Sequence, residues 1–394
     1  MNSSLLLLHV SFALIIGLLT TRLFKALHLN LPDVTAYLIS GIIIGPYVLG
    51  ALGVEGLGLV SMEEVESLGI ISDVALGFIA FAIGNEFRLE DIKKIGKKAF
   101  TIGIFQAIVA ALLVDAVLIT ISLVTNQELL TMPAAIILGA IAAATAPAAT
   151  LMVVRQYKAK GNITKLLLPI VALDDAVGLV VFAISFGIAQ ALLTSQITIT
   201  AIVVEPIIEI IGSLLLGTLM GVILSYLEKL FFSNRNRVAL SIGFVLMTIT
   251  LSAQSFTIGS IKIGFSTLLV NMMLGTTLCN LNERSADIME RCEKWTTPLY
   301  ALFFCLSGAE LELGVFKEPQ MVLIGVIYIV VRALGKYVGA YGSAKATGCD
   351  DITCKYLGIT LFPQAGVALG MVVRLPLLVE LRQSLLEMLL CLRL

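Results

Sequence analysis

The amino-acid sequence predicts an all-α, polytopic membrane protein of about thirteen transmembrane helices. Of its 394 residues, 58 % are hydrophobic and only 13 % are charged, whereas soluble chains carry about a quarter charged residues. The apolar residues fall into segments close to the ~20 residues that a helix needs to cross a bilayer. Basic residues gather in alternate loops between these segments. A transmembrane barrel would instead show short segments of alternating polarity.

Short connections join the apolar segments, so we expect one integral membrane domain over residues 1–394. The segments are 4–24, 33–50, 70–85, 98–123, 132–157, 166–193, 203–227, 237–255, 260–280, 297–313, 320–343, 354–374 and 376–393. Two charged stretches, 89–98 and 282–294, are interpreted as amphipathic cytoplasmic connectors.

Basic residues predict the orientation in the membrane. The odd-numbered loops and their flanks are rich in Lys and Arg, whereas the even-numbered loops and flanks hold only Lys262, Lys317 and Arg374. Cytoplasmic loops carry an excess of Lys and Arg. We therefore expect the N-terminus outside and the odd loops in the cytoplasm, with the protein in the plasma membrane and in contact with lipids.

Two adjacent carboxylates, Asp174 and Asp175, interrupt the otherwise uncharged stretch 166–193. A span of about 20 residues that enters at Leu166 places both of them near the bilayer midplane. An ionised carboxylate there costs several kcal/mol unless it meets a partner, a cation or water. Ionisable residues inside a membrane are functional by default, so the rest of the chain must supply a counter-charge and a cavity.

The fifth segment contains a helix break in AATAPAAT, residues 143–150. Pro147 lacks an N–H and clashes with the preceding turn, which disfavours a straight helix. The alanines allow another backbone to approach closely, and Thr145 and Thr150 offer hydroxyl oxygens.

A second break is predicted in the twelfth segment, in LFPQAGVALG, residues 361–370, where Pro363 and Gln364 lie near the centre. Interrupted segments at corresponding places in two halves indicate a transporter binding site. The two sets of segments, four to six and eleven to thirteen, start on opposite sides of the membrane, which predicts an inverted repeat.

The eleventh segment supplies the counter-charge. Arg332 lies near its centre, and Lys336 follows one helical turn later on the same face. Arg332 is the preferred partner of an aspartate by its depth and by its forked guanidinium. Lys336 is the secondary candidate, since it could extend to the cytoplasmic interface.

Other classes of site have little support. The cysteines have no CxxC spacing and the chain has two histidines, so neither a transition-metal site nor a cofactor is expected. No basic patch indicates nucleic-acid binding. Asp115 stands alone in the fourth segment, and Gln106 and Asn271 are expected to form interhelical hydrogen bonds.

The chain resembles the second family of monovalent cation/proton antiporters, the sodium/proton exchangers related to Kef-type potassium exchangers. The aspartate pair is the specific part of this resemblance. The matching stretches are LPDVTAYLISGIIIGPYVLG (31–50), GFIAFAIGNEF (77–87), TAPAAT (145–150), ALDDAVGLVVF (172–182), LFFCLSGAELEL (302–313), RALGKYVGA (332–340) and FPQAGVALG (362–370).

The resemblance implies the sodium/proton antiporter fold, with a dimerisation domain, a core domain and two broken helices that cross beside the ion site. It implies that Asp175 binds the ion or the proton, that Asp174 pairs with Arg332, and that the protein is a homodimer. The core would cover about 70–193 and 297–394, and the dimerisation scaffold about 4–50 and 203–280.

Three departures from the family accompany the resemblance. The cation is Arg332 where electrogenic relatives carry lysine, and Ala146 stands where related exchangers often have an aspartate before the proline. The segment 376–394 carries charges among its leucines, unlike a normal closing span.

The expected function is secondary active Na⁺/proton antiport, serving pH homeostasis, rather than enzyme catalysis. Proton and Na⁺ would compete for Asp175, helped by Thr145 and loose carbonyls, since hard oxygen ligands suit alkali ions. A K⁺/proton exchanger and a sodium-coupled symporter are the alternatives. An intramembrane aspartyl protease is disfavoured, because adjacent helical residues point about 100° apart.

Overall fold

The computed structural model describes residues 3–28, 31–53, 58–85, 87–127, 129–194, 205–254, 256–258, 261–311, 313 and 319–364. Within these ranges the chain is helical apart from its turns and one small hairpin, which confirms the predicted all-α class. The predicted last segment, 376–394, lies outside the described residues.

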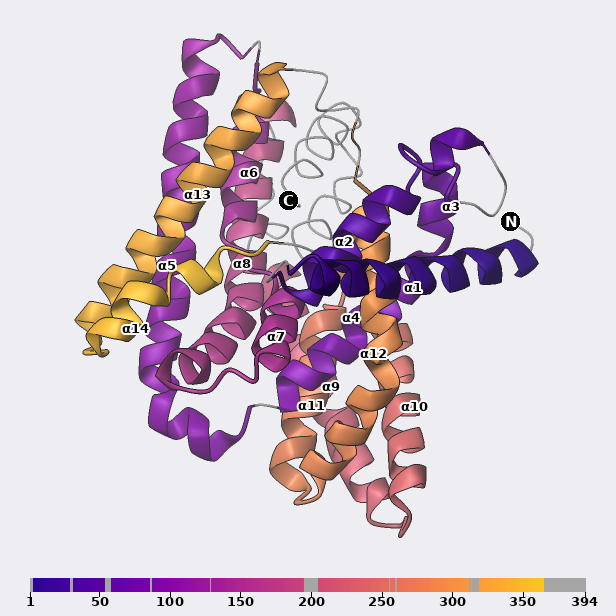
Figure 1. Cartoon of the computed structure of the whole chain (residues 1–394). Helices are drawn as coiled ribbons and strands as arrows, with labels where there is room; N and C mark the ends of the chain where they lie inside the picture. Colours follow the sequence, from indigo (N-terminus) through magenta and orange to yellow (C-terminus); the bar gives the residue numbers. More distant parts are fainter. Residues whose placement is uncertain are drawn as a thin grey trace.

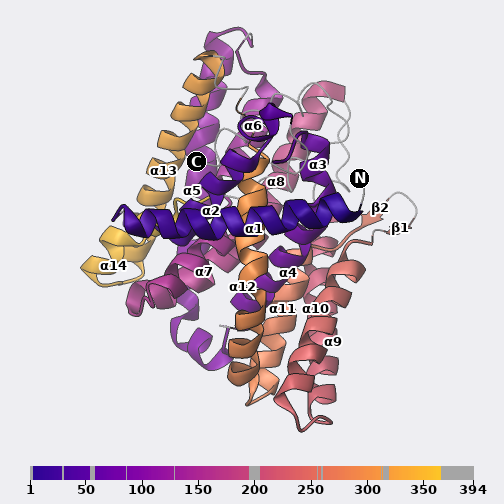
Figure 2. The same cartoon turned by 45° about the vertical axis from the view of Figure 1, so that its right-hand side comes forward.

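One bundle is built from helices of the first and third quarters of the chain, which pack on one another in Figure 1. Its helices are α1 (Ser3–Ala26), α2 (Asp33–Ile44), α4 (Gly69–Asn85), α9 (Glu205–Glu228), α10 (Asn234–Ser252), α11 (Thr267–Leu281) and α12 (Ser285–Ala309). The short helix α3 (Met62–Ser67) precedes α4. Helix α1 packs on α2 and α12 and runs across the upright helices behind it (Figure 2).

The second bundle is centred on α5 (Leu89–Val124) and α13 (Pro319–Ala346), which lie side by side in Figures 1 and 2. Its other members are α6 (Met132–Ala142), α7 (Pro147–Gln156), α8 (Asn162–Thr194), α14 (Asp351–Tyr356) and the 3₁₀ helix η4 (Ile359–Leu361). Helix α7 joins the two bundles, because it packs against α8 on one side and against α2 and α4 on the other.

Several helices are long and apolar enough to cross a membrane. Among the described residues, stretches of 22, 29, 22 and 28 residues meet that requirement: Leu5–Ala26, Gly96–Val124, Ile207–Glu228 and Pro319–Ala346. At 1.5 Å per residue, each exceeds the ~30 Å of a bilayer's hydrocarbon core. Helices α2, α4, α6 and α11 are shorter and also apolar.

The two predicted connectors are not separate from the spans that follow them, because they belong to the same helices. Residues 89–98 form the first turns of α5, and most of 282–294 forms the first turns of α12. Polar residues at the end of an apolar helix allow it to continue beyond the bilayer, so the charged stretches extend the spans. The predicted span 260–280 is also corrected, since the antiparallel hairpin of β1 (Phe256–Ile258) and β2 (Ile261–Ile263) precedes α11.

Two segments of the expected core pack with the first bundle, while the division into core and dimerisation scaffold stays a prediction. Segments 70–85 and 297–313 were assigned to the core, but α4 packs chiefly on α11 and α12, and α12 packs chiefly on α2 and α4. Gly84 and Gly275 permit backbone contact between α4 and α11, since a Cβ at Gly275 would lie 2.2 Å from the carbonyl oxygen of Phe81. Both segments therefore belong to the first bundle.

Helices α5 and α13 approach each other more closely than ordinary side chains allow. A Cβ at Gly335 would stand 2.7 Å from the Cα of Ala110, and a Cβ at Gly339 would stand 2.7 Å from the Cα of Gln106. Small residues four apart permit such close packing of membrane helices. This contact brings Lys336, which lies between the two glycines, against the face of α5 that carries Gln106.

Candidate functional site: a buried ion pair at two crossed breaks

The first break lies between α6, which ends at Ala142, and α7, which begins at Pro147. Pro147 occupies the first turn of α7, where its missing N–H leaves no hydrogen bond unmade. Residues 143–146 connect the two half-helices and are all buried. The predicted interruption of the fifth segment is thus confirmed, and it places main-chain groups inside the second bundle.

The second break follows η4, where Phe362, Pro363 and Gln364 lie outside any helix. The N–H of Ala146 donates to the carbonyl oxygen of Pro363 at 2.9 Å. The Nε2 of Gln364 donates to the carbonyl oxygen of Ile141 at 2.9 Å. The two interrupted segments therefore meet at their breaks, as the inverted-repeat interpretation predicts.

Arg332 binds the main chain at this meeting point. Its Nε donates to the carbonyl oxygen of Ala142 at 3.2 Å and its Nη2 to that of Ala144 at 2.7 Å. Its Nη1 donates to the carbonyl oxygen of Phe362 at 2.6 Å. These carbonyls belong to helix ends that lack intrahelical donors and carry partial negative charge, so the guanidinium neutralises both breaks at once.

Lys336 forms the ion pair of the site. Its Nζ lies 3.0 Å from Oδ2 of Asp174, and both side chains are 0 % exposed. The same ammonium donates to Oγ1 of Thr145 at 3.0 Å and to the carbonyl oxygen of Ala143. A buried charge pair is stable only when its remaining hydrogen-bonding groups are also satisfied, and here three acceptors surround the ammonium.

Asp174 has donors on both of its oxygens. Thr145 Oγ1 and Lys336 Nζ donate to Oδ2, and Gln106 Nε2 donates to Oδ1. These donors come from α5, α13 and the connection between α6 and α7. The carboxylate is therefore the point at which four parts of the bundle converge.

The predicted pairing of Asp174 with Arg332 is wrong in this structure, and the secondary candidate Lys336 takes that position. The reason is the two breaks, because their carbonyls without intrahelical partners offer Arg332 three acceptors that match its planar, forked donors. One turn further along α13, Lys336 is left to meet the carboxylate. The arginine that departs from the family pattern is accordingly not the residue in contact with Asp174.

The predicted ligands fall into three groups. Thr145 lies in the site and contacts both charged residues. Thr150 is buried, but its hydroxyl donates to the carbonyl oxygen of Ala146 within the first turn of α7, at 2.9 Å. Asp175 follows Asp174 on α8, and its side chain lies outside the described residues, so its role as the Na⁺ ligand stays a prediction.

Two further residues of the site were not predicted as functional. Gln106 was expected to form an interhelical hydrogen bond, which is confirmed, but its partner is Asp174. Tyr328 exchanges hydrogen bonds with Gln364 at 3.0–3.3 Å and steadies the second break. The spacing of Gly335 and Gly339 around Lys336 is the sequence signal that could have placed Gln106, because it marks the face of α13 that another helix approaches.

A family model described as the transmembrane sodium/hydrogen exchanger matches residues 10–392, nearly the whole chain. The chain belongs to the sodium/hydrogen exchanger family. It is therefore an integral membrane antiporter by family, and the family is one of transporters rather than enzymes.

The individual relatives are distant from this chain in sequence. The chain is 23 % identical to the Na⁺/H⁺ antiporter NhaS4 of Synechocystis, over 89 % of this chain and 83 % of the relative. It is 22 % identical to the ammonium/H⁺ antiporter subunit AmhT of Alkalihalophilus pseudofirmus, over 85 % and 80 %. A chloroplast K⁺ efflux antiporter of Arabidopsis thaliana is 24 % identical over 88 % of this chain, but over only 28 % of its own length.

The solved structures agree on the fold. The sodium proton antiporter MjNhaP1 of Methanocaldococcus jannaschii superimposes with a TM-score of 0.73, at 18 % identity, over 100 % of this chain and 95 % of that one. The antiporter fold implied by the sequence is thereby confirmed.

Proposed function

We propose that the protein exchanges a monovalent cation, Na⁺ in the first place, for protons by alternating access. The buried pair of Lys336 and Asp174 at the crossed breaks carries this proposal. A cation that binds this carboxylate competes with the ammonium of Lys336 for its negative charge, so the ion pair weakens when the cation is present. Asp175, adjacent on α8, is the proposed carboxylate that proton and cation share.

The exchange would follow from competition. With the site open to one side, Asp175 loses its proton and takes up the cation with Thr145 and the carbonyls of the break as oxygen ligands. The cation weakens the attraction between Asp174 and Lys336 by offering the carboxylate another positive partner. Rocking of the second bundle against the first would then expose the loaded site to the opposite side.

Lysine in the ion pair favours release of two protons per cation. An arginine effectively never gives up its charge, whereas a buried lysine that loses its partner can. A cation that displaces Lys336 would thus release one proton from the ammonium and one from Asp175. Exchange of two protons for one monovalent cation moves net charge, so we propose electrogenic transport.

The proposed moving unit is the second bundle, α5–α8 with α13 and α14, and the proposed scaffold is the first bundle. We further propose that the scaffold forms a homodimer, that the N-terminus lies outside and that the protein serves pH homeostasis in the plasma membrane. The spread of basic residues over alternate loops supports the orientation.

Proteoliposomes with a trapped pH dye test the proposal. After a proton gradient is imposed, external Na⁺ should drive proton movement in the wild type and none in Asp175→Asn. The variant should show the same thermal unfolding and the same elution on size exclusion as the wild type. Normal exchange in Asp175→Asn would overturn the assignment of the site.

K⁺ is the second candidate cation, because two relatives bear the name of K⁺ efflux antiporters. The same vesicles, given K⁺ or Li⁺ in place of Na⁺, identify the ion. Failure of every alkali ion with a folded sample would exclude alkali-ion exchange and favour a symporter, whose cation flux needs a second substrate.

A further inference from the structure

Gln106 is held beside the ion pair by its backbone. Its Cα packs directly against Gly339 of α13, which has no side chain to separate the two helices, and Gln106 is 0 % exposed. The amide cannot swing toward water from this position. It must satisfy its hydrogen-bonding groups inside the bundle, next to Asp174.

The orientation of the amide is determined by its neighbours. Nε2 donates to the carbonyl oxygen of Gly103 at 2.9 Å and to Oδ1 of Asp174. Both neighbours are acceptors, so a flipped amide would set its oxygen against a carbonyl and a carboxylate. The nitrogen therefore faces them and Oε1 faces away.

No described residue donates a hydrogen bond to Oε1 of Gln106, although this atom is buried. Asn271 provides the contrast, because its amide is equally buried and both of its ends are paired, with Thr248 and the carbonyl oxygen of Thr267. Buried polar atoms without a partner are rare in folded proteins and require an explanation.

A cation supplies that explanation. The two ends of an amide group are about 2.2 Å apart, so Oε1 lies within about 5 Å of Oδ1 of Asp174. Oxygen ligands stand about 2.3–2.6 Å from Ca²⁺, and Na⁺ is of similar radius. Two oxygens that share one such cation are at most about 5 Å apart, so the separation of Oε1 and Oδ1 is compatible with a shared cation.

We propose that Oε1 of Gln106 is a ligand of the transported cation and sets its affinity. The inference rests on the proposed exchange and adds an oxygen from α5 to a site otherwise built from α8 and the break after α6. The amide would act at both ends, with Nε2 holding the carboxylate and Oε1 receiving the ion. A neutral oxygen is needed here all the more because Ala146 brings no carboxylate to the break.

One substitution removes both ends of the amide, and the choice of cation separates their roles. Gln106→Met removes the donor and the oxygen. A ligand oxygen helps to discriminate cations by size, whereas a residue that only positions Asp174 affects all cations alike. We expect the KM for Na⁺ in exchange to rise at least tenfold in Gln106→Met, and the ratio of the affinities for Na⁺ and K⁺, measured by calorimetry on the purified protein, to change at least threefold.

Asn271→Leu is the matched control, since it deletes a fully paired buried amide far along the chain. It should lower thermal stability and leave the KM for Na⁺ unchanged. Gln106→Asn, which withdraws the oxygen by one methylene, covers the case in which Gln106→Met does not fold, and it should raise the KM in the same direction.

The outcomes are distinct. Equal weakening of Na⁺ and K⁺ binding in Gln106→Met would show that the residue only positions Asp174, and an unchanged KM in Gln106→Met would exclude any ligand role. Both results overturn the inference while the wild type still exchanges Na⁺. If the wild type exchanges neither Na⁺ nor K⁺, the proposed function fails instead, and calorimetry with NaCl and KCl still tests the ligand.

Discussion

Lys336 combines a buried charge with the ability to lose it, and in the proposed exchange this combination makes transport sensitive to voltage. In Lys336→Arg the ion pair with Asp174 is retained but its proton cannot leave. We expect exchange to continue with one proton fewer per cation. The rate of Na⁺-driven proton movement should then lose its dependence on membrane potential, as measured in proteoliposomes clamped at a series of potentials.

An arginine is preferable to a neutral residue in this test, because removing one partner of a buried pair costs about 3–5 kcal/mol. Lys345→Arg is the control, since Lys345 lies exposed in the last turn of the same helix. Unaltered voltage dependence in Lys336→Arg would show that the ammonium does not release its proton during transport.

Asp174 and Arg332 were predictable as buried charges, but their predicted pairing is wrong, and Lys336, expected to reach the cytoplasmic interface, is buried beside Asp174. Charge and depth in the membrane are properties of single residues, and both can be estimated from the chain. The acceptors that occupy Arg332 are main-chain carbonyls of Ala142, Ala144 and Phe362. Main-chain acceptors become free only where a helix breaks in a particular way, so residue identities do not reveal them.

At the scale of elements, the site depends on how closely α13 approaches α5. Gly339→Val would place a branched side chain 2.7 Å or less from the Cα of Gln106. Backbone cannot yield as a flexible side chain can, so the helices must separate and Lys336 must withdraw from Asp174. We expect the melting temperature to fall by several degrees and Na⁺/proton exchange to fall at least tenfold.

Gly342→Val is the matched control on the same helix, because nothing lies within 4 Å of a Cβ built at Gly342. Both substitutions carry the same loss of helix-compatible rotamers. The difference between the two variants in melting temperature and exchange rate therefore reports the contact alone. Equal effects in both would mean that the α5–α13 approach is not what positions the pair.

Elements were predictable where the signal is local. Pro147 and Pro363 indicated both breaks, and the crossing of the breaks followed from their corresponding places in the two halves. Helix ends were less predictable. The charged first turns of α5 and α12 have the composition of connecting loops, but they are helical and extend each helix beyond its apolar span. The hairpin of β1 and β2 depends on the pairing of two three-residue strands, which leaves too short a pattern to recognise.

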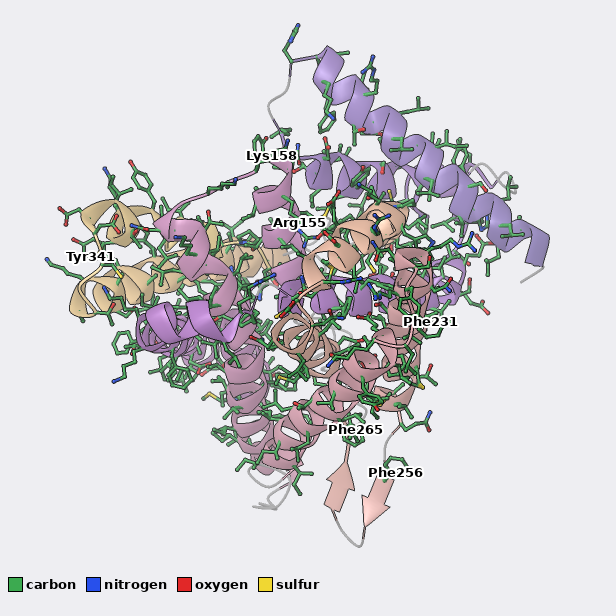
Figure 3. All side chains as sticks on the ribbon, turned by 90° about the horizontal axis from the view of Figure 1, so that it is seen from below. Arg155, Lys158, Phe231, Phe256, Phe265 and Tyr341 are labelled. Carbon is green, nitrogen blue, oxygen red and sulfur yellow. The ribbon has the colours of Figure 1, made fainter. Side chains whose placement is uncertain are left out.

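On the scale of the whole molecule, the two bundles are tied together at one end of α7. Arg155 Nη2 lies 2.8 Å from Oε1 of Glu293 on α12, and Gln156 Oε1 accepts a hydrogen bond from the N–H of Asp33 on α2 at 2.9 Å. Arg155 is labelled at this end in Figure 3. Rocking of one bundle against the other requires these contacts to open, so they favour the conformation described here.

Glu293→Gln should weaken that tie. The two side chains are 22 % and 34 % exposed, and pairs in contact with water contribute about 0.2–1 kcal/mol, so the equilibrium should shift by up to about fivefold toward the opened arrangement. Hydrogen–deuterium exchange should accelerate in α7 and at the start of α12, and high salt should reduce the difference from the wild type. Glu290→Gln is the control, because Glu290 pairs with Lys294 within α12 and not across the bundles. If both variants accelerate exchange equally, the effect is local fraying of α12 and the bundles are held by their apolar contacts alone.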